Sequence, residues 1–458
     1  MRSLCYLLLA AVAAFGQQGP QQQLARDIFK QLIEINTTDS AGDNTRAAEA
    51  VAARFRAAGF PAKDVQVLSP APRKGNVVIR LHGTGPAKPV LFIGHLDVVE
   101  AKRSDWSFDP FTFLEKDGYF YGRGTEDMKG DDAIIIATFL RLKQAGFKPS
   151  RDLILALTSD EEGGNFNGIS WLVKNHRDLI DAEFCVNFDG GGGDIKNGKY
   201  RFMGVEAAEK VFNSFKLETT NPGGHSSKPR KDNAIYELAD GLSRLEKYEF
   251  PVKLFDVTRS YFEKAAPLYE GQLGADMKAM ARNPNDAAVV ARLSALPQYN
   301  ALLRTTCIPT MLSGGHAENA LPQTATAVIN CRLLPVDKSE EVQATLRKVL
   351  ADPKIDISVM TPAKATKYVP MNPTVLSAIT AATTKQWPGL PVIPEMATGA
   401  SDGVYLNVAG IPTYAVSGIF GDEDDVRAHG RDERILVKSF YDALGFVYDL
   451  ATTLGNAR

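Results

Sequence analysis

Two histidines and four acidic residues, far apart along the chain, each follow a predicted strand or lie in a loop near one. They are His95, Asp127, Glu161, Glu162, Asp189 and His429. Imidazole nitrogens and carboxylate oxygens, with no thiolate among them, suit zinc or, less selectively, manganese or cobalt. Two histidines and three carboxylates are too many for one tetrahedral catalytic zinc, but they suit two ions that share a bridging acid. The set therefore predicts a dinuclear metal site and hydrolytic chemistry.

Each motif has a simpler interpretation when it is taken alone. His95 and Asp97 leave their strand on the same side, but a histidine and an aspartate two positions apart also occur by chance. The glycine-rich run 122–130 would serve equally as a helix N-terminus whose acids complement the dipole, and the acids within 159–164 would suit a solvated loop. Coincidence at every one of these positions within a single domain is improbable, which favours the metal site.

The chemistry of such a site follows from the residue types. A water molecule shared by two zinc ions loses a proton near neutral pH, and the ions polarise the carbonyl of the bond that breaks. Glu161 can accept that proton and pass it to the leaving nitrogen, provided that its pKa lies near the working pH. The oxyanion that forms then needs hydrogen-bond donors.

The elements that must position these residues alternate between strands and helices. The pattern predicts helices within 22–58 and at 132–145, 169–175, 375–387 and 437–454, and strands at 76–81, 90–93, 153–158, 184–188 and 413–416. Nearly continuous apolar strands separated by helices indicate a sheet covered on both faces. Ligands of such sheets gather beyond the carboxyl ends of the strands.

A different pattern occupies the middle of the chain. Strands are predicted at 211–219, 305–312, 324–333 and 355–360, and helices at 233–248 and 340–350. The order β-α-β-β-α-β is the ferredoxin-like arrangement. A mostly helical stretch, 250–303, is extra to that plan and has no role that its pattern reveals. The predicted fold class is α/β, a mixed sheet flanked by helices, with an inserted α+β ferredoxin-like lid domain.

The predicted domain organisation follows from this alternation. The catalytic domain is expected in two parts, 17–207 and 364–458, separated by the lid domain at 208–363. The first residues, 1–16, have the layout of a secretory signal, with a basic start, an apolar run and small residues before a polar stretch. A buried amphipathic helix is the alternative, but no polar face recurs every three or four residues. We therefore expect a secreted or periplasmic protein with no permanent membrane anchor, because the run is too short to span a bilayer.

The composition is that of an ordinary globular protein. Of 458 residues, 44% are apolar and 23% charged, which excludes a disordered, collagen-like or coiled-coil chain. Lys and Arg number 52 against 54 Asp and Glu, and no basic block occurs, so nucleic acid is not expected as a partner. Four cysteines are too few for a disulfide framework. Without the signal three remain, Cys185, Cys307 and Cys331, and the odd number predicts buried thiols.

Taken together, the motifs resemble those of the M20 family of co-catalytic zinc peptidases and amidohydrolases, over nearly the whole chain after the signal. The segments that carry the resemblance are Gly94–Asp97, Tyr121–Gly130, Asp160–Gly163, Gly223–Ser226 and Asn319–Pro322. The resemblance implies a zinc exopeptidase-like catalytic domain with two Zn²⁺ ions, Co²⁺ or Mn²⁺ being alternatives. It implies one ion held by His95, Asp127 and Asp189, and the other by His429, Glu162 and the shared Asp127.

The same resemblance implies supporting roles around the ions. Glu161 matches the general base, and Asp97 matches the residue that orients His95. In this family the bridging acid often precedes a non-proline cis peptide bond, which makes the Asp127–Met128 bond a candidate. Packing or supporting roles are assigned to Trp106 and Arg123, and structural or surface roles to His82, His176 and His316.

Substrate contacts are implied mainly for the lid domain. His225 matches a family histidine that reaches the active site from the smaller domain, often from a partner subunit, which allows a homodimer through the lid. Arg332 matches an arginine that often holds a substrate carboxylate, which a guanidinium fits bidentately. Asn319 belongs to the same corner, and the loop with Gly399 and Ser401 resembles a substrate-side loop. The local alternatives are a turn histidine, an exposed strand arginine and a glycine-rich turn.

The sequence therefore predicts an exported dinuclear metallohydrolase that cleaves an amide bond next to a free carboxylate. Its substrate would be a small peptide or an N-acyl amino acid, as for a carboxypeptidase, a dipeptidase or an N-acyl-amino-acid hydrolase. Two other hypotheses stay open: a non-catalytic peptide or amino-acid binding module that kept the fold, and an aminopeptidase of the related two-zinc M28 class. The M28 hypothesis requires that the inserted β-α-β-β-α-β domain be absent.

Overall fold

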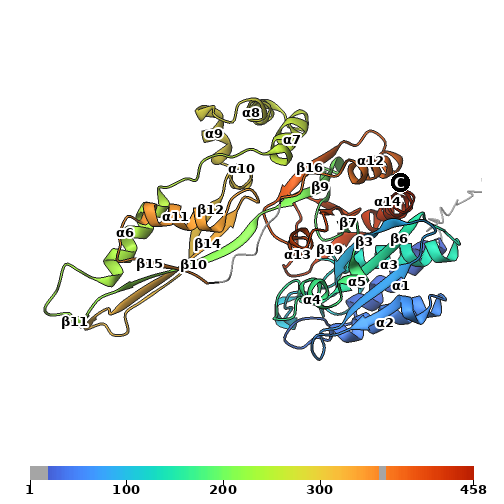
Figure 1. Cartoon of the computed structure of the whole chain (residues 1–458), viewed down its shortest axis with the longest axis horizontal. Coiled ribbons are helices and arrows are strands. Elements are labelled where there is room, and N and C mark those ends of the chain that lie inside the picture. The colour runs from blue at the N-terminus through green and yellow to red at the C-terminus, as the bar shows by residue number, and fades with distance from the viewer. Residues whose placement is uncertain (1–18, 361–367, 458) are drawn as a thin grey trace, which may run out of the picture.

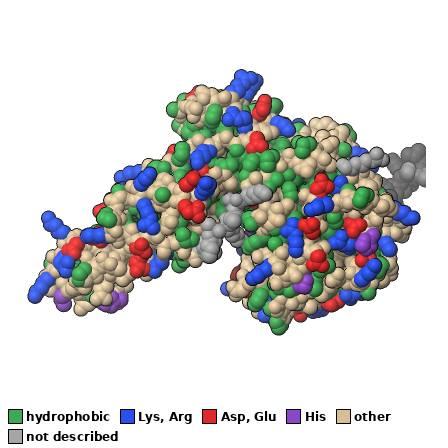
Figure 2. Space-filling view, in the orientation of Figure 1, with side chains coloured by type: hydrophobic (Ala, Val, Ile, Leu, Met, Phe, Trp, Pro, Cys, Tyr) green, Lys and Arg blue, Asp and Glu red, His purple; other side chains and the backbone are tan. Residues whose placement is uncertain are grey.

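The computed structural model describes residues 19–360 and 368–457, so the predicted signal peptide, 1–16, lies outside the described residues. A helix-flanked α/β domain lies at one end of the molecule and an elongated α+β domain at the other, with a group of helices above the junction (Figure 1). Side chains of both charge signs are dispersed over the face shown in Figure 2. In the described part of the chain, no helix combines the length and the apolar character needed to cross a membrane.

The α/β domain is built from both ends of the chain. Its helices are α1 (Pro20–Ile33), α2 (Asn44–Ala57), α3 (Lys129–Gln144), α4 (Gly168–Asn175), α5 (Arg177–Ile180), α12 (Pro373–Gln386), α13 (Gly403–Val408) and α14 (Val437–Gly455). The strands of its large sheet are β1 (Val65–Leu68), β2 (Asn76–Leu81), β3 (Ala87–His95), β6 (Arg151–Thr158), β7 (Phe184–Asn187), β8 (Gly192–Lys196), β9 (Lys199–Glu209), β16 (Val392–Ala397), β17 (Thr413–Ala415) and β18 (Phe420–Asp422). A small sheet contains β4 (Leu114–Lys116), β5 (Tyr119–Tyr121) and β19 (Arg434–Leu436).

The large sheet is mixed, as predicted. Its ten strands follow the order β1-β2-β6-β3-β7-β17-β9-β8-β18, and β16 pairs with β9 outside this path. The neighbours β6, β3 and β7 run parallel to one another. Because parallel strands end at the same edge of a sheet, whatever follows these three strands meets at one place.

Alternate residues of the central strands face two separate cores. In β3, Phe92 packs in the core that contains Phe29 of α1 and Phe440 of α14. Its neighbour Leu91 packs in the core that contains Leu172 of α4. Successive side chains of a strand point to opposite faces, so the continuous apolar runs correspond to a sheet covered on both sides. The predicted fold class is confirmed.

The inserted domain has the predicted order of elements. It contains β10 (Val211–Thr220), β11 (Gly224–His225), α6 (Ala234–Glu246), β12 (Thr306–Gly314), β13 (Ala320–Leu321), β14 (Thr324–Leu333), α11 (Ser339–Leu350) and β15 (Asp356–Val359). Four of its strands form an antiparallel sheet in the order β12-β14-β10-β15. Phe215, Leu238 and Leu346 belong to a core of its own between this sheet and its helices. The presence of this domain contradicts the M28 hypothesis.

The extra segment 250–303 forms a group of helices that we call the helical insertion. It contains α7 (Asp256–Ala265), α8 (Gly271–Arg282), α9 (Ala287–Ser294) and α10 (Pro297–Leu303). Its core includes Phe262 and Met280 together with Phe202 of β9 and Ile393 of β16. The helical insertion therefore packs on the large sheet of the α/β domain, although its sequence lies within the inserted domain.

The prediction of unpaired cysteines is wrong for two of the three. Cys307 of β12 and Cys331 of β14 form a disulfide, whereas Cys185 is a buried thiol. The two bonded residues lie opposite each other in the antiparallel register of β12 and β14. The two cysteines become neighbours only when β12 and β14 pair. The number of cysteines in the sequence therefore could not predict this disulfide.

Two strands that border the site had no predicted counterpart. They are β9 and β16, which pair in parallel. Glu206 and Glu209 in β9, and Pro394 and Glu395 in β16, belong to residue types that are depleted in strands. The strands form because their apolar residues are buried against the helical insertion. This is a tertiary contact that the local residue preferences do not contain.

Candidate metal centre

Three parallel strand ends supply most of the predicted ligands. His95 is the last residue of β3, Glu162 lies in the loop directly after β6, and Asp189 follows β7. Asp127 comes from the loop before α3, and His429 from the loop between β18 and β19. The carboxyl edge of the sheet thus collects side chains from both halves of the α/β domain.

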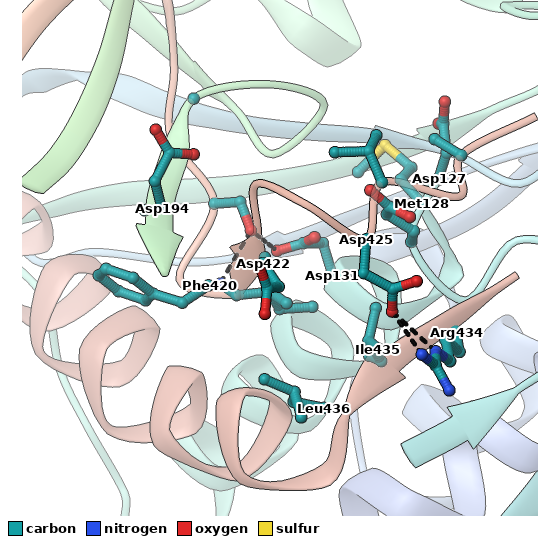
Figure 3. Close-up of a pocket in the computed structure, with 18 of the residues that line it drawn as sticks. Asp127, Met128, Asp131, Asp194, Phe420, Asp422, Asp425, Arg434, Ile435 and Leu436 are labelled. Carbon is teal, nitrogen blue, oxygen red and sulfur yellow. Dashed lines mark hydrogen bonds and ion pairs between the residues drawn. The ribbon is translucent and has the colours of Figure 1, made fainter. Parts of the chain in front are cut away.

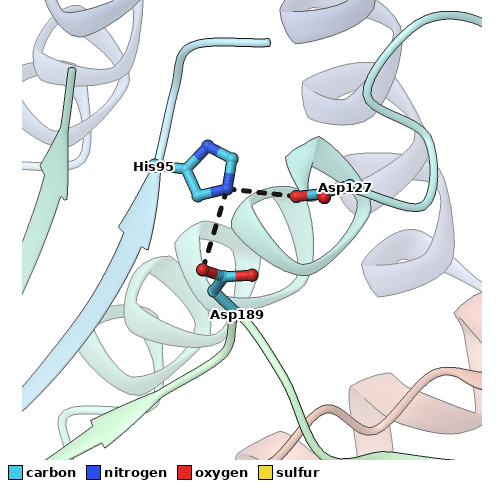
Figure 4. A group of neighbouring side chains, drawn as sticks. All are labelled: His95, Asp127 and Asp189. Carbon is cyan, nitrogen blue, oxygen red and sulfur yellow. Dashed lines mark hydrogen bonds and ion pairs between the residues drawn. The ribbon is translucent and has the colours of Figure 1, made fainter. Parts of the chain in front are cut away.

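The first candidate ligand group contains His95, Asp127 and Asp189, whose side chains face one another (Figure 4). His95 Nε2 lies 3.1 Å from Asp127 Oδ1 and 4.0 Å from Asp189 Oδ2. His95 is buried, so this group lies in the deeper part of the site.

The second candidate group contains Asp127, Glu162 and His429. His429 Nε2 lies 3.0 Å from Asp127 Oδ2 and 3.0 Å from Glu162 Oε1. The His429 side chain is 53% exposed, so this group opens toward solvent. The two oxygens of Asp127 therefore face different histidines, which is the arrangement that a bridging carboxylate needs.

The donor set fits a pair of divalent cations. Each group offers one imidazole and two carboxylates, and the candidate ligand atoms of a group lie within 4.8 Å of one another. Such nitrogen and oxygen donors suit zinc, manganese or cobalt. Burial raises the pKa of Asp189 to about 7. Although burial acts the other way, hydrogen bonds from His429 and His95 hold the pKa of Asp127 below its usual range. Cations would balance the acids gathered here.

Glu161 lies beside both groups without belonging to either. Burial raises the pKa of Glu161 to about 10; His95 opposes the rise, and the carboxylate of Asp189 adds to it. Nearby cations favour the ionised form of a carboxyl group. Metal binding would therefore move the pKa of Glu161 down toward the range in which a general base works.

Asp97 holds the loop that carries Glu161 and Glu162. Its carboxylate accepts hydrogen bonds from the backbone N–H groups of Glu161 (3.2 Å) and Glu162 (3.0 Å). His95 Nδ1 lies 3.0 Å from the backbone oxygen of Asp97 and 3.7 Å from its carboxylate. A proton on Nδ1 directed at these oxygens leaves Nε2 free to bind a metal.

Glu433 supports Asp127 and was missed by the sequence analysis. Its buried carboxylate accepts backbone hydrogen bonds from Gly124 (2.9 Å), Glu126 (2.7 Å) and Asp127 (3.0 Å). It also forms an ion pair with Arg123, at 2.6 Å. The available signal was an acid four positions after His429, but nothing local linked that acid to a loop 306 positions earlier.

The loop before α3 contains a cis peptide bond, and its residue Arg123 contacts Trp106. The Asp127–Met128 peptide bond is cis, as the resemblance implied. The Arg123 guanidinium lies 5.0 Å from the centre of the Trp106 ring, so these two residues pack against each other beside the loop.

A cavity of about 280 Å³ reaches Asp127 and Asp189 from the side of β18 (Figure 3). Its lining includes eight acidic residues, Asp131 and Asp194 among them, and one basic residue, Arg434. Within it Asp425 pairs with Arg434, at 2.7 Å. The carboxylates of the metal centre therefore belong to a larger acidic region.

His225 and Asn319 are not brought to the metal centre within one chain. His225 lies on β11 and Asn319 directly precedes β13, in the short β11–β13 hairpin region at the far tip of the inserted domain, where Ser226 N donates to the Asn319 carbonyl (Figure 1). His225 is exposed and accepts a hydrogen bond from Ser227 N, at 3.2 Å. The ten residues of β10 separate the tip from the junction by roughly 30 Å.

The other predicted substrate residues lie nearer to the metal centre. Arg332 is opposite Phe212, near the end of β10 that joins the α/β domain, and its guanidinium lies 4.9 Å from the phenyl ring centre. Burial lowers the pKa of Arg332. Gly399 and Ser401 line a cavity that also includes Asp189.

Comparison with known proteins relates this site to a family of hydrolases. The profile of peptidase family M20/M25/M40 matches residues 91–453. Probable carboxypeptidase S-like 2 from Dictyostelium discoideum is 29% identical over 385 residues, covering 79% of this chain and 71% of the relative. The N-fatty-acyl-amino acid synthase/hydrolase PM20D1 from Xenopus tropicalis is 29% identical over 357 residues, covering 76% and 69%.

A solved structure shares the fold over almost its whole length. The M20 family metallo-carboxypeptidase Sso-CP2 from Sulfolobus solfataricus matches with a TM-score of 0.70 at 18% identity. The match covers 94% of this chain and 99% of the other. Both the α/β domain and the inserted domain therefore have counterparts in a known structure.

Proposed function

The chain belongs to peptidase family M20/M25/M40, and on that premise we propose that it is a dinuclear metallohydrolase that cleaves an amide bond next to a free carboxylate. The observation that carries the proposal is the position of Asp127. One of its carboxylate oxygens lies 3.1 Å from His95 Nε2 and the other lies 3.0 Å from His429 Nε2. A carboxylate between two imidazoles, with a further acid beside each, is the donor set of a two-metal hydrolase.

In the proposed mechanism, the residues of the site have separate roles in hydrolysis. Zinc ions bound there would supply Lewis acidity, which lowers the pKa of water and polarises the scissile carbonyl. Glu161 accepts the proton of the attacking water and delivers it to the leaving nitrogen. Asp97 keeps Glu161 in place through the backbone N–H that it binds, and through its carbonyl it keeps the His95 ring oriented. The partial burial of Glu161 limits competing proton exchange with bulk water.

The proposed substrate has a free carboxylate on its leaving side. Arg332 lies near the domain junction, and its planar guanidinium suits a carboxylate. The curated relatives, named as a carboxypeptidase and as an N-fatty-acyl-amino acid hydrolase, support this substrate class. Small peptides and N-acyl amino acids are therefore the proposed substrates.

The proposed active unit is a homodimer formed through the inserted domain. His225 lies too far from its own metal centre to act there, so a second copy would supply it. The strand β12 is an edge of the four-stranded sheet, with Ile308, Met311 and Leu312 at least 60% exposed. Exposed edge strands with apolar side chains pair readily with another chain.

Export is part of the same proposal. The signal-like pattern over 1–16 supports it. The disulfide between Cys307 and Cys331 also supports it, because structural disulfides persist mainly in oxidising compartments. The proposed location is secreted or periplasmic.

A substrate panel tests the proposed function. Zinc-loaded protein with measured metal content is incubated with dipeptides, with N-acyl amino acids and with the same compounds as C-terminal carboxamides. We expect turnover of the free acids, at least about 100-fold faster than that of the carboxamides, because the carboxamide leaves the guanidinium of Arg332 without its anion. Turnover of none of them would favour the binding-module hypothesis, and equal turnover of acids and carboxamides would overturn the carboxylate requirement.

A further inference from the structure

A second cavity adjoins the metal centre on the side of Asp189, with a volume of about 430 Å³. It shares Asp189 with the first candidate ligand group, so the cavity and the metal centre meet at this residue. Its walls come from three parts of the chain: the loop after β7, the ends of β9 and β16 with the loop that follows, and α10. The helical insertion thus reaches the substrate side of the molecule.

The wall formed by α10 is firmly anchored. Leu303 is fully buried in the core shared by the helical insertion and the large sheet. Leu302 packs against this core and against the main core of the α/β domain. Leu302 and Gln298 then face the cavity. Since α10 is fixed to the sheet, these two side chains form a defined boundary of the cavity.

The opposite wall carries carboxylates. Glu206 and Glu395 are register partners on β9 and β16. Gly190 leaves the room that Glu206 occupies, because a Cβ at Gly190 would lie 2.6 Å from Glu206 Oε2. Glu209 accepts hydrogen bonds from the backbone N–H and the hydroxyl of Ser401, at 2.7 and 2.8 Å.

Positive charge is missing from this wall. No lysine or arginine is among the described residues that line the cavity. Glu395 makes no hydrogen bond or ion pair with any residue of 19–360 or 368–457, in contrast to Glu209. Burial raises the pKa of Glu395 to about 8. A carboxyl group placed against a cavity without a protein partner is available to a ligand.

We propose that this cavity binds the acyl portion of the substrate and selects acyl groups that carry an ammonium or guanidinium group. The proposal rests on the proposed function. A substrate ammonium group would favour the ionised form of Glu395, which a substrate carboxylate would oppose, and the neighbouring cations Arg332 and Lys210 lie outside the lining of the cavity. The substrate is therefore oriented with its carboxylate toward Arg332 and its acyl portion in the cavity. Leu302 and Met396 contact the methylene stem of that acyl portion.

Matched substrates test the charge requirement. The substrates are 6-aminohexanoyl-alanine and heptanoyl-alanine, which have the same chain length and differ in the terminal ammonium or methyl group. We expect kcat/KM to be at least about 10-fold higher for the ammonium substrate, because a charge-assisted hydrogen bond to a buried carboxylate is strong. A ratio near one, or a preference for the heptanoyl compound, would overturn the proposal.

Variants of residues that line the cavity test whether the cavity causes the preference for the ammonium substrate. Glu395→Gln should bring the ratio of the two kcat/KM values close to one while hydrolysis of heptanoyl-alanine continues. Leu302→Trp should fill the cavity and slow both substrates. Glu263→Gln, which changes an exposed glutamate of α7, is the matched control and should leave the ratio unchanged. An unchanged ratio in Glu395→Gln would contradict the assignment.

Direct binding separates this inference from the proposed function. Calorimetry measures the binding of 6-aminohexanamide and heptanamide. Both compounds contain the acyl portion but no amino acid, so neither can release one. Tighter binding of 6-aminohexanamide, lost in Glu395→Gln, would support the cavity even if no amide were hydrolysed. If both alanine conjugates were hydrolysed and the two amides bound equally well, the proposed selection of positively charged acyl groups by the cavity would be contradicted. The proposed hydrolytic function would be unaffected by that result.

Discussion

The metal centre and the tip of the inserted domain contain similar residue types in opposite surroundings. At the metal centre, His95 and Asp127 come from distant segments, and the Nε2 atom of the buried His95 lies 3.1 Å from Asp127 Oδ1. At the tip, His225 and Asn319 are held by a two-stranded ribbon in the solvent. Histidine side chains stand out at that end of the molecule in Figure 2.

The difference comes from how each sheet is built. Parallel neighbours such as β6, β3 and β7 end at one edge, so residues that follow them converge without help from another chain. The antiparallel β10 and β14 carry the tip roughly 30 Å away from the junction. The candidate ligand groups therefore form within one chain, whereas the tip would reach a metal centre only in the proposed homodimer.

Removal of the shared carboxylate should have the largest effect. Asp127→Ala takes one ligand from each group, so we expect loss of both ions and a fall in kcat/KM of roughly 10⁴-fold or more. Metal analysis and kinetics of the purified variant check this result. Asp105→Ala, an exposed aspartate of the same domain, is the control. Retention of two ions in Asp127→Ala would contradict the bridging role.

Replacement of the proposed base should separate chemistry from metal binding. Glu161→Gln keeps the size of the side chain but cannot accept the proton, so kcat should fall by about 10²- to 10⁴-fold with two ions retained. Glu162→Gln should lower the metal content as well, because it changes a candidate ligand. Normal turnover by Glu161→Gln would remove Glu161 from the mechanism.

The tip should matter for activity only through a second chain. His225→Ala should lower kcat by about 10²- to 10³-fold if it donates to the oxyanion. When His225→Ala and Glu161→Gln chains are mixed and allowed to exchange, half of the sites in each mixed dimer are intact, and about one quarter of wild-type activity should return. His176→Ala is the control for loss of a histidine outside either site. No recovery on mixing would contradict the dimer.

The disulfide should affect stability much more than chemistry. The double variant Cys307→Ala, Cys331→Ala removes a cross-link between residues 24 positions apart, which typically lowers the free energy of unfolding by about 2–4 kcal/mol. Denaturant unfolding measures this loss, while metal content should stay at two ions per chain. Loss of metal in the double variant would show that the stability of the inserted domain affects the metal centre of the α/β domain, although the two domains have separate cores.

The sequence predicted the parts of the site that strand ends determine. His95 and Asp189 could be placed because an apolar strand precedes each one, and parallel strands share an edge. The mixed sheet and the ferredoxin-like order were predictable for the same reason, since each strand and helix has a local pattern.

The features that the sequence did not predict depend on contacts between distant parts of the chain, which no local pattern contains. Glu433 supports a loop 306 positions away, and the Cys307–Cys331 bond follows from strand pairing. The strands β9 and β16 form against their residue preferences because the helical insertion packs on them. The cavity beside Asp189 follows from that packing, so it could not be predicted from the segment 250–303 alone.

Anomalous diffraction from crystals of the zinc-loaded protein tests the central claim most directly. We expect two peaks in each chain, roughly 3.5–4 Å apart, with the Asp127 carboxylate between them and His95 and His429 on opposite sides. A single peak in each chain, or two ions that do not share Asp127, would contradict the dinuclear site from which the proposed function is derived.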